Sequence, residues 1–559
     1  MKRDTAALSR SVYDLAVVGG GIYGICAAHE AARRGLTVCL VDRADFVSAT
    51  SSNSLKTVHG GLRYLQHADL RRMRESIRER AMLLRTAPHL VRPLPFVIPT
   101  YGYGLRSKAV MRTALFLNDV VGFDRSAGVR EGRSIPPGRV IGRDEVRAIV
   151  PDLDPRGLTG GAVWYDCQIA NTERLALAYL RAAVEGGAVC ANYVEATGLL
   201  LRGGKVQGIR ARDRLSEDTF DIQARMVLNA AGPWADRLLQ SIPGARGTRR
   251  FHPSKAMNLV TRRLFGDHAI GFTVPTEFRD SDAILNKGTR LFFVVPWKQF
   301  SLIGTRHLPY QGDPDDFRIT EDDIAVFLAE IQTACPSAGL SRKDVLAVLG
   351  GLLPEVPRPG PHEVQLVKHS RVYDHASEGA DGLISAVGVK WTTARLTAEE
   401  AVNLVERRLR PGDPPRHPAE RPLPGGDLEV LDGSPPREQA PAGVRPEALR
   451  HLLENYGSTT RELLGYVRAD PSLGTELVAG SPVIGAEVVF GVEREMARQL
   501  DDVVLRRTEL AAGGHPGAEA LRRCAELMGS VLGWSQERRD AEIARTGAML
   551  HESVAVTSS

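Results

Sequence analysis

The chain has 559 residues, of which 43% are hydrophobic and 25% charged, and its formal net charge is +5. Because a single hydrophobic core stops growing at roughly 250–300 residues, this length predicts two or three domains. The weak positive charge suits an anionic small substrate or an anionic membrane surface, and it is too weak to indicate a nucleic-acid-binding protein.

The cysteine pattern and the N-terminal sequence both indicate a cytoplasmic protein. No CxxC or Cys/His spacing occurs, so we expect reduced, buried thiols and no metal site. The cysteines are Cys26, Cys39, Cys167, Cys190, Cys335 and Cys524. The N-terminal MKRDTAALSRS lacks an apolar signal segment, and no apolar run reaches the roughly 18 residues of a membrane span. We therefore expect at most peripheral contact with the inner face of the membrane.

Residues 13–42 have the pattern of a dinucleotide-binding turn. An apolar run precedes Gly19, Gly21 and Gly24, and a helical segment and a second apolar run lead to Asp42. Gly19 allows the tight turn, Gly21 lets the backbone approach a pyrophosphate, and Gly24 lets helix and strand pack closely. The helix N-terminus attracts the anion, and an acid roughly 20 residues later binds the ribose. This register favours a nucleotide site over a flexible glycine loop.

A polar, glycine-containing loop follows directly, in residues 49–65, ATSSNSLKTVHGGLRYL. Its Ser/Thr cluster, its lysine and its double glycine suit a loop that wraps phosphates and lies against a flat ring, although a polar surface loop is the plain alternative. Residues 68–86 then place apolar residues at helical spacing among five arginines. This helix either is solvated on one side or docks on a membrane.

Helical and strand patterns alternate in the middle of the chain. Residues 172–185 predict an amphipathic helix, and alternating strands flank a turn at Gly203 and Gly204. A buried strand from Met226 ends in small residues, which suits close approach to a cofactor or plain packing. Residues 250–370 run apolar or alternate between turn signals, so this region is expected to be β-rich.

The last part of the chain reads as a strand, a helix, a linker and a helical region. The segment 381–409 predicts a strand, a glycine turn and a helix capped by Thr392 or Thr393. Residues 411–445 are dense in proline and glycine, as in a linker. Helical patterns follow, including EVVFGVEREMARQLDDVVLRRTEL. Its two adjacent arginines, Arg506 and Arg507, could face the substrate or the cofactor-binding domain, but a solvated or salt-bridged face is the preferred expectation.

Several motifs together resemble the FAD-dependent glycerol-3-phosphate dehydrogenases, members of the D-amino-acid-oxidase-like flavoprotein superfamily. They are GGGIYG, ATSSNSLKTVHGGLRYL, YDCQIANTERL, VLNAAGPWADRL, FFVVPWKQFSLIGT and VKWTTAR. The resemblance runs from about Tyr13 to about Trp534, and HGGLRYL and KWTT are specific to this family. Some relatives are monotopic membrane proteins that pass electrons to quinone.

The resemblance implies an α/β fold with three parts. A Rossmann-like FAD-binding domain would comprise residues 1–80, 155–245 and 375–410. An inserted substrate-binding domain with a mixed or antiparallel β-sheet would comprise residues 81–154 and 246–374. The linker 411–445 would lead to an all-helical C-terminal domain, residues 446–559.

The family motifs, matched residue by residue, imply a set of FAD-binding positions. They are Gly19, Gly21, Ile22, Tyr23, Gly24, Asp42, Arg43, Thr50, Ser51, Ser52, Ser54, Lys56, His59, Gly60, Gly61, Leu62, Val194, Ala231, Gly232, Trp234, Gly388, Lys390, Trp391 and Thr392. Lys390 is also expected at the substrate.

The substrate positions implied by the resemblance include both matches and departures. Arg63 and Tyr64 match the family, as does Lys390, and Lys368 replaces an arginine. Basic side chains at these positions suit recognition of a phosphate or carboxylate. Two substrate positions depart from the family: Asn258 replaces a histidine, and Leu353 replaces an arginine.

A third departure lies in a turn that reads Gly304-Thr305-Arg306-His307. We expect His307 to accept the alcohol proton, with a pH dependence near neutrality, and Arg306 to hold the developing charge. Adjacent residues of a strand point to opposite faces, so only one of the two is expected to reach the flavin. Lys390 is the third candidate catalytic residue.

Three classes of function fit these features. The first is an FAD-dependent dehydrogenase that oxidises an alcohol carbon of a small phosphorylated polyol or sugar by hydride transfer to flavin N5. The second is an amine or amino-acid oxidase on the same fold, and the third is a non-catalytic flavin-binding protein. The electron acceptor would be quinone or oxygen, and the sequence leaves the substrate and the oligomeric state open.

Overall fold

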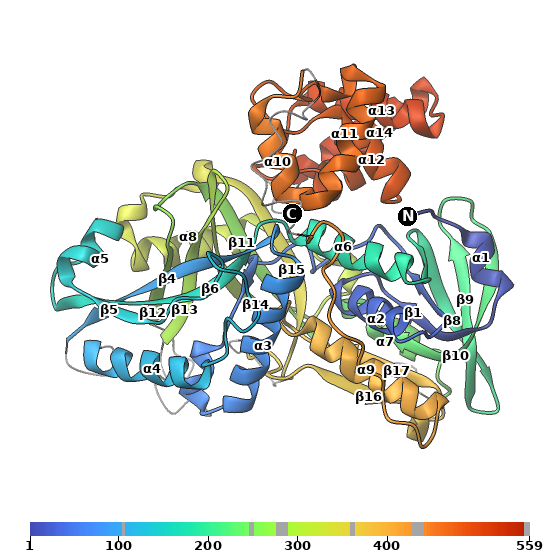
Figure 1. Ribbon diagram of the computed structural model, residues 1–559, viewed down its shortest axis with the longest axis horizontal. Coiled ribbons are helices and arrows are strands. Elements are labelled where there is room, and N and C mark those ends of the chain that lie inside the picture. The colour runs from blue at the N-terminus through green and yellow to red at the C-terminus, as the bar shows by residue number, and fades with distance from the viewer. Residues whose placement is uncertain are drawn as a thin grey trace.

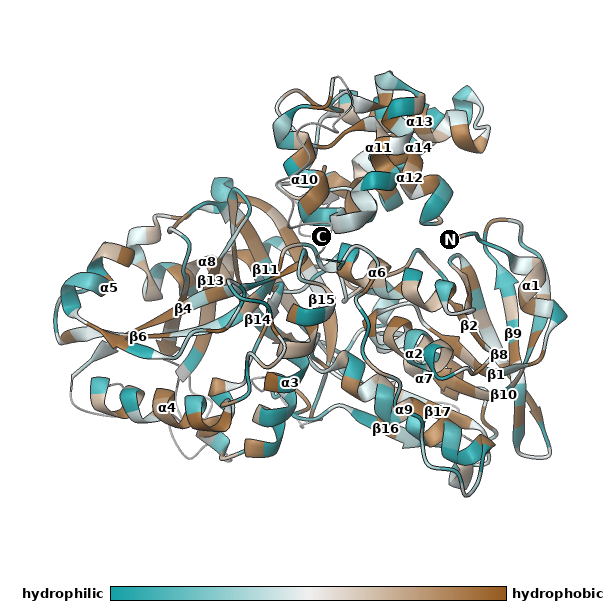
Figure 2. Cartoon of the chain, in the orientation of Figure 1, coloured by the Kyte–Doolittle hydropathy of each residue, from teal (hydrophilic) through white to brown (hydrophobic). Residues whose placement is uncertain are grey.

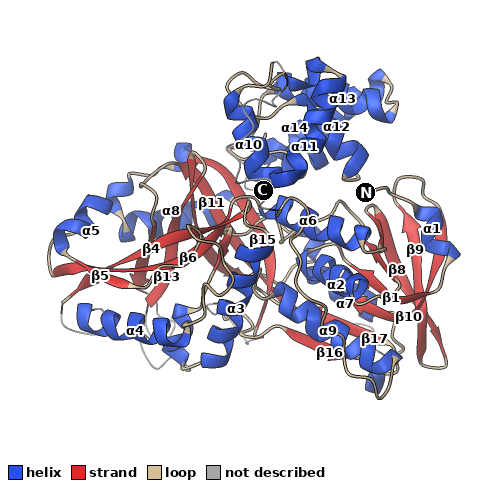
Figure 3. Ribbon diagram, viewed as in Figure 1, coloured by secondary structure: helices blue, strands red, loops and turns tan. Residues whose placement is uncertain are grey.

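The computed structural model describes residues 1–102, 107–151, 153–244, 251–275, 289–357, 364–427, 441 and 443–552. Two β-sheets lie side by side, and a helical domain covers one edge of both (Figure 1). Figure 3 shows that this third part, above the sheets in the view, contains helices and loops. The predicted linker 411–445 falls partly on residues 428–440 and 442, which lie outside the described residues.

The first sheet carries the dinucleotide pattern. Its strand order is β16-β17-β10-β1-β2-β7, with the β8-β9 hairpin continuing from β10. The strands are β1 (Tyr13–Val18), β2 (Val38–Val41), β7 (Val189–Ala191), β8 (Val194–Arg202), β9 (Lys205–Asp213), β10 (Thr219–Asn229), β16 (Arg371–Asp374) and β17 (Leu383–Val387). Strand β1 lies between β2 and β10 and is parallel to both. The glycine turn after β1 therefore lies at the point where the strand order of the sheet reverses, which is the usual ligand site of such sheets.

Helices cover both faces of this sheet. They are α1 (Thr5–Arg10), α2 (Ile22–Arg33), α6 (Thr172–Glu185), α7 (Ala235–Leu239) and α9 (Ala394–Leu409). Helix α2 packs between α6 and α9 in a core rich in alanine, which permits close approach. The bounds of α6 agree with the prediction, and Gly203 and Gly204 have positive φ angles in the predicted hairpin turn.

The second sheet has the strand order β15-β11-β14-β13-β12-β4-β6-β3, with β5 paired to β6. The strands are β3 (Thr57–Val58), β4 (Val91–Tyr101), β5 (Arg139–Ile141), β6 (Leu158–Ile169), β11 (His252–Arg262), β12 (Ala269–Pro275), β13 (Thr289–Trp297), β14 (Phe300–Pro309) and β15 (Val345–Glu355). Strand β6 pairs with β4 along its whole length, so the division between the sheets falls after Ile169 rather than at residue 155.

Four helices accompany the second sheet: α3 (Leu70–Thr86), α4 (Lys108–Val121), α5 (Arg143–Ile149) and α8 (Glu321–Ala334). Helix α8 lies in the stretch expected to be β-rich, where a Thr320–Asp323 capping box starts it. Short 3-10 helices are η1 (Leu62–His67), η2 (Gly232–Trp234), η3 (Pro314–Asp316), η4 (Pro336–Ala338), η5 (Arg342–Asp344), η6 (Ala376–Glu378), η7 (Gly457–Thr459) and η8 (Pro471–Gly474).

The C-terminal domain contains α10 (Pro446–Tyr456), α11 (Thr460–Ala469), α12 (Gly485–Arg494), α13 (Ala518–Leu532) and α14 (Gln536–Glu552). The helical run expected from residue 487 onward is broken. Helix α12 ends at Arg494, Met496 takes a left-handed φ of 59°, and a π-helix, η9, follows over Asp502–Arg507. The helical spacing of hydrophobic residues continues past Arg494 in the sequence, which is why an unbroken helix was expected. The turn at Met496 directs the chain toward the first sheet, where Asn192 donates to the Met496 carbonyl.

Two further expectations concern the cysteines and the membrane. All six cysteines are buried as thiols, as their apolar contexts predicted. Among the described helices, none has both the length and the apolar character needed to cross a bilayer.

Candidate active site

A cavity of about 1650 Å³ is lined by residues of both sheets, and it contains most of the predicted site. All eight positions expected at the substrate and catalytic end line it, from Arg63 to Lys390. Among the predicted FAD-binding residues, only Gly24, Ser52 and Gly60 do not. Gly24 and Gly60 pack against neighbouring chain instead, and Ser52 Oγ donates to the Ala49 carbonyl within its own loop.

The three glycines of the turn have different reasons to lack a side chain. A β-carbon at Gly24 would lie 1.9 Å from the Gly19 carbonyl oxygen, and one at Gly19 would lie 2.5 Å from that of Ala230. At Gly21 it would meet only Ser51 Oγ, at 3.2 Å. Packing within the chain therefore explains Gly19 and Gly24, whereas Gly21 borders the cavity, as a glycine under a pyrophosphate would. The turn thus fits FAD.

Asp42 holds the turn together. Its carboxylate accepts hydrogen bonds from the Gly20 amide at 2.6 Å and the Ala44 amide at 2.8 Å, and it lines the cavity. Burial raises the pKa of Asp42 to about 6, so the group is ionised at pH 7. Next to it, the Arg43 guanidinium stacks 4.3 Å from the Trp234 ring and pairs with Asp315. The predicted ribose end is thus a polar, partly charged corner.

The 49–65 loop is tied to the turn and to the last segment of the first sheet. Ser51 Oγ accepts from the Ile22 amide at 3.0 Å, and its carbonyl accepts from Trp391 Nε1 at 2.8 Å. Lys56 Nζ is buried and pairs with Glu173 at 3.1 Å, so its charge is balanced within the protein. The loop therefore lines the cavity, and its lysine is part of the fold. That it wraps the phosphates of a cofactor stays a prediction.

Tyr23 of α2 fixes the loop before α9. Its hydroxyl donates to the Lys390 carbonyl at 3.0 Å and accepts from the Lys390 amide at 3.2 Å. A β-carbon at Gly388 would lie 2.2 Å from that hydroxyl, so the glycine permits the contact. Thr393 is the N-cap of α9 but makes no side-chain cap hydrogen bond, whereas Thr392 Oγ1 accepts from the His59 amide at 3.3 Å.

The cationic wall of the cavity is built around Tyr64. Its ring lies 4.2 Å from the Arg72 guanidinium and 4.3 Å from Lys390 Nζ, which also hydrogen-bonds the phenol oxygen. Arg72 in turn donates to the Lys368 carbonyl at 3.0 Å. Burial, followed by the charges of Arg72 and Arg63, lowers the pKa of Lys390 to about 7. Four cationic residues therefore converge here, with one of them poised to titrate near neutrality.

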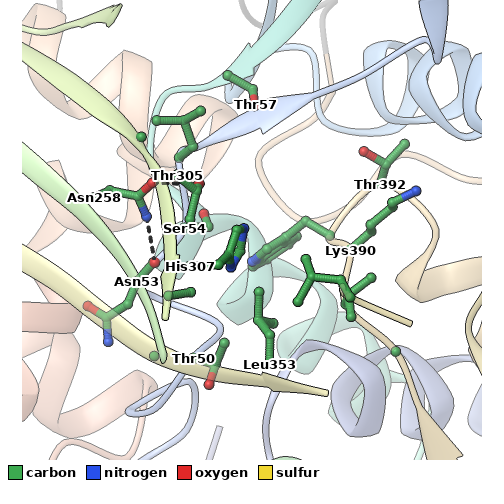
Figure 4. A pocket seen from close by; sticks show the side chains of 18 of the residues that line it. Thr50, Asn53, Ser54, Thr57, Asn258, Thr305, His307, Leu353, Lys390 and Thr392 are labelled. Atoms are coloured by element: carbon green, nitrogen blue, oxygen red, sulfur yellow. Dashed lines mark hydrogen bonds between the residues drawn. The ribbon is translucent and has the colours of Figure 1, made fainter. Parts of the chain in front are cut away.

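The wall formed by β14 carries His307, the expected proton acceptor, which Figure 4 labels, and Arg306, expected to hold the developing charge. Burial, followed by the charges of Arg290, Arg63 and Arg306, lowers the pKa of His307 to about 4. The imidazole is therefore neutral at physiological pH. Arg306 lies 3.2 Å from Glu330 of α8, which Arg290 also contacts. Both His307 and Arg306 border the cavity, although they are adjacent on the strand.

The two substituted family positions have different environments. The Asn258 amide donates to the Asn53 carbonyl at 3.2 Å and accepts from Thr305 Oγ1 at 2.8 Å, both drawn in Figure 4. It thereby joins the 49–65 loop to β14. Leu353 lies in the wall near His307, so an apolar side chain stands where the resemblance implied an arginine.

The site also contains residues that the sequence did not single out. Asp166 accepts from the Gly60 amide at 2.5 Å, from Arg80 at 2.5 Å and from Trp164 Nε1 at 3.1 Å. Although burial raises its pKa, the His59 hydrogen bond and the Arg80 charge hold it at about 2. The acid in the YDCQIAN motif was a usable signal, but its partners come from distant segments.

Comparisons with known proteins place these features in a family. Residues 14–404 match the family model described as FAD dependent oxidoreductase, and residues 418–539 match the C-terminal domain of alpha-glycerophosphate oxidase. The chain is 32% identical over 553 residues to a glycerol-3-phosphate dehydrogenase of Synechocystis sp., covering 97% of both chains. It is also 32% identical to the mitochondrial glycerol-3-phosphate dehydrogenase of Mus musculus, covering 95% of this chain and 72% of that one.

A solved structure resembles the whole chain. The glycerol-3-phosphate dehydrogenase from Bacillus halodurans, complexed with FAD, is 26% identical, with a TM-score of 0.75 and coverage of 99% of this chain and 97% of that one. The match extends through both sheets and the C-terminal helices.

Proposed function

Because the chain belongs to the FAD-dependent glycerol-3-phosphate dehydrogenase family, we propose that it oxidises the alcohol carbon of glycerol 3-phosphate or of a closely related phosphorylated polyol. The proposal rests on one observation: a cavity that joins a dinucleotide turn to a cluster of cationic side chains. FAD supplies the acceptor for the substrate hydride at flavin N5. The protein must then hold the anionic end of the substrate and receive the hydroxyl proton.

The residues divide between these two tasks. Arg63, Tyr64 and Lys390 would hold the phosphate, with Arg72 and the Lys368 segment supporting them. His307 on the β14 wall would take the proton, because its imidazole is neutral and has a nitrogen lone pair, whereas the Asn258 amide cannot accept a proton at neutral pH. The lowered pKa of His307 makes it a weaker base than a free histidine. The amine or amino-acid oxidase alternative is not favoured, since relatives matched over nearly the whole chain are named glycerol-3-phosphate dehydrogenases.

Anaerobic bleaching of the flavin absorbance tests the proposal directly. Glycerol 3-phosphate should bleach the purified enzyme, whereas glycerol at the same concentration should not, because it lacks the anion that the cationic wall would bind. Bleaching by amino acids alone would instead establish the oxidase alternative. A flavin that no polyol phosphate or amino acid reduces would indicate a non-catalytic flavoprotein.

We propose that the electron acceptor is a membrane quinone rather than oxygen. Helix α4 supports this: Val110, Met111 and Ala114 line the cavity, while Phe116 and Val120 on the same helix are 65% and 53% exposed. A helix with one face on the cavity and an apolar face in solvent suits delivery of an apolar acceptor from a bilayer. Reduced enzyme should be reoxidised faster by quinone in vesicles than by dissolved oxygen; the reverse order would favour an oxidase.

A further inference from the structure

A buried ion cluster joins the C-terminal domain to the first sheet. In the π-helix η9, Arg507 donates two hydrogen bonds of 2.8 Å to the two carboxylate oxygens of Asp45. Arg506 donates a third, of 2.6 Å, to the same carboxylate. The side chains of Arg507 and Asp45 are completely buried. Of the roles expected for the two adjacent arginines, the salt-bridged one is therefore correct and the solvated one is wrong.

Asp45 belongs to the loop that encloses the predicted nucleotide end of the cavity. Within this loop, Asp42 accepts from the Gly20 and Ala44 amides, and the Val47 amide donates to the Gly20 carbonyl at 2.9 Å. The loop residues around Asp45, including Ala44 and Val47, line the cavity, whereas Asp45 does not. Its carboxylate therefore holds the loop from behind, on the side away from the ligand.

We propose that Arg506 and Arg507 act through Asp45 as positioning residues for the nucleotide end of FAD, which makes the C-terminal domain part of the cofactor site. The proposal rests on the FAD-dependent function above. A bidentate guanidinium–carboxylate pair fixes both the distance between the two groups and the plane of the carboxylate. The backbone of the loop that carries the carboxylate is thereby held in one position. Without the pair, the backbone groups of residues 42–47 would sample other positions, and FAD binding would have to order them.

Plain docking of the two domains is the competing explanation, and the chain offers a matched control for it. Arg174 of α6 forms another buried ion pair across the same interface, 2.6 Å from Glu495. This pair makes no contact with the 42–47 loop. The double variant Arg174→Met/Glu495→Gln removes it and retains the Glu495 carbonyl, which accepts from Arg507. The Glu495 carboxylate that it replaces lies 4.0 Å from Arg507 Nε, beyond hydrogen-bond distance, so the bidentate Arg507–Asp45 pair is left intact. Loss of docking alone should therefore affect the control as much as the Asp45 cluster.

The experiment compares FAD binding and thermal unfolding in Arg507→Lys, Asp45→Asn and the control double variant. The apoprotein is titrated with FAD by flavin fluorescence, and unfolding is followed with and without FAD. In Arg507→Lys and Asp45→Asn the FAD dissociation constant should rise at least about tenfold, the lower end of what losing a supporting contact costs at metal sites. The control should bind FAD as wild type does. The increase in unfolding temperature on adding FAD should shrink only in the cluster variants.

Each other outcome overturns the inference. If FAD affinity falls equally in the control, or is unchanged in all variants, the cluster serves domain docking alone. If Asp45→Asn does not fold, the inference is tested by the conservative Arg507→Lys variant alone. This variant keeps the positive charge and loses the bidentate hydrogen bonds to Asp45. The titration uses no substrate and measures only FAD binding. If the wild-type protein binds FAD and the variants bind it equally well, only this inference is refuted. Wild-type protein that binds no FAD would refute the proposed function as well.

Discussion

Lys390 is the residue whose charge the pH should control. In the free enzyme its pKa is lowered to about 7 by burial and by the nearby Arg72 and Arg63, so it is cationic at pH 6 and largely neutral at pH 8. Binding of a phosphate requires the cation, so affinity should fall as pH rises through about 7. A bound phosphate favours the charged form and would shift that fall to higher pH.

Two substitutions of Lys390 distinguish the effect of its positive charge on substrate affinity from the effect of losing that charge as the pH rises. Lys390→Ala removes a charge-assisted hydrogen bond worth about 1.5–3 kcal/mol, so the apparent substrate constant should rise roughly 10–150-fold, with a smaller fall in turnover. Lys390→Arg should keep affinity across pH 6–9, because guanidinium does not titrate there. Steady-state kinetics over this pH range measure both effects. An alanine variant with wild-type constants would remove Lys390 from the site.

His307 should determine the rate of flavin reduction rather than affinity. Its imidazole, whose pKa burial and three arginines lower to about 4, is neutral throughout pH 5–8. The pH dependence near neutrality expected of an ordinary histidine is therefore assigned to Lys390. His307→Asn should slow the reductive half-reaction by about 10²–10⁴-fold in stopped-flow experiments. An unchanged rate would show that the hydroxyl proton is accepted by another group, such as neutral Lys390 or a second group of the substrate.

The sequence predicted residues whose role is local and missed those whose role depends on a distant partner. Gly21 and Asp42 could be singled out from the sequence because one turn and one strand define their spacing. Arg72 and Asp166 were not singled out. Whether an arginine of an amphipathic helix points inward depends on what packs against it, and the partners of Asp166, such as the Gly60 amide and Arg80, come from other segments of the chain. Asp45 is the clearest case, because its two arginine partners lie more than 450 residues away.

The turn between β1 and α2 allows an element-scale test with two glycines. Gly21→Val should fold and lose FAD, because its β-carbon meets only Ser51 Oγ and its methyl groups would enter the cavity. Gly24→Ala should instead lower the stability of the apoprotein, by about 1–3 kcal/mol or more, because its β-carbon meets the Gly19 carbonyl at 1.9 Å. The ratio of flavin to protein absorbance and the unfolding of the apoproteins distinguish the two. Normal flavin content in Gly21→Val would refute the assignment of the turn.

Helices were predicted where periodicity and caps agree and misjudged where tertiary contacts intervene. The bounds of α6 follow from its amphipathic pattern, whereas the run after α12 looks helical and turns at Met496. The arginine-rich helix α3 illustrates a related limit. Two of its arginines, Arg72 and Arg80, are buried against Tyr64 and Asp166, so only part of its charge faces solvent.

At the scale of the whole molecule, the apolar surface that suits a membrane lies on α4 rather than on α3. Phe116 is 65% exposed and Phe123, just after the helix, 80%. Figure 2 shows α4 at the lower edge of the molecule with hydrophobic residues along it. Arg112 on the same helix and Arg78 on α3 are exposed cations, which favours an anionic bilayer. For residues 68–86, membrane docking was one of two alternatives, and we propose that α4 takes that role instead.

Sedimentation with vesicles that contain anionic lipid tests this orientation. Each phenylalanine that enters the bilayer contributes about 1.5–3 kcal/mol, so Phe116→Asp/Phe123→Asp should weaken vesicle binding by roughly 100-fold or more. Val326→Asp is the matched control, because Val326 is 48% exposed on α8 and should not contribute. Raising the salt concentration should weaken wild-type binding through the arginines and leave the phenylalanine contribution. If the double variant sediments with vesicles as wild type does, α4 does not face the membrane, and a dissolved acceptor such as oxygen becomes the better expectation.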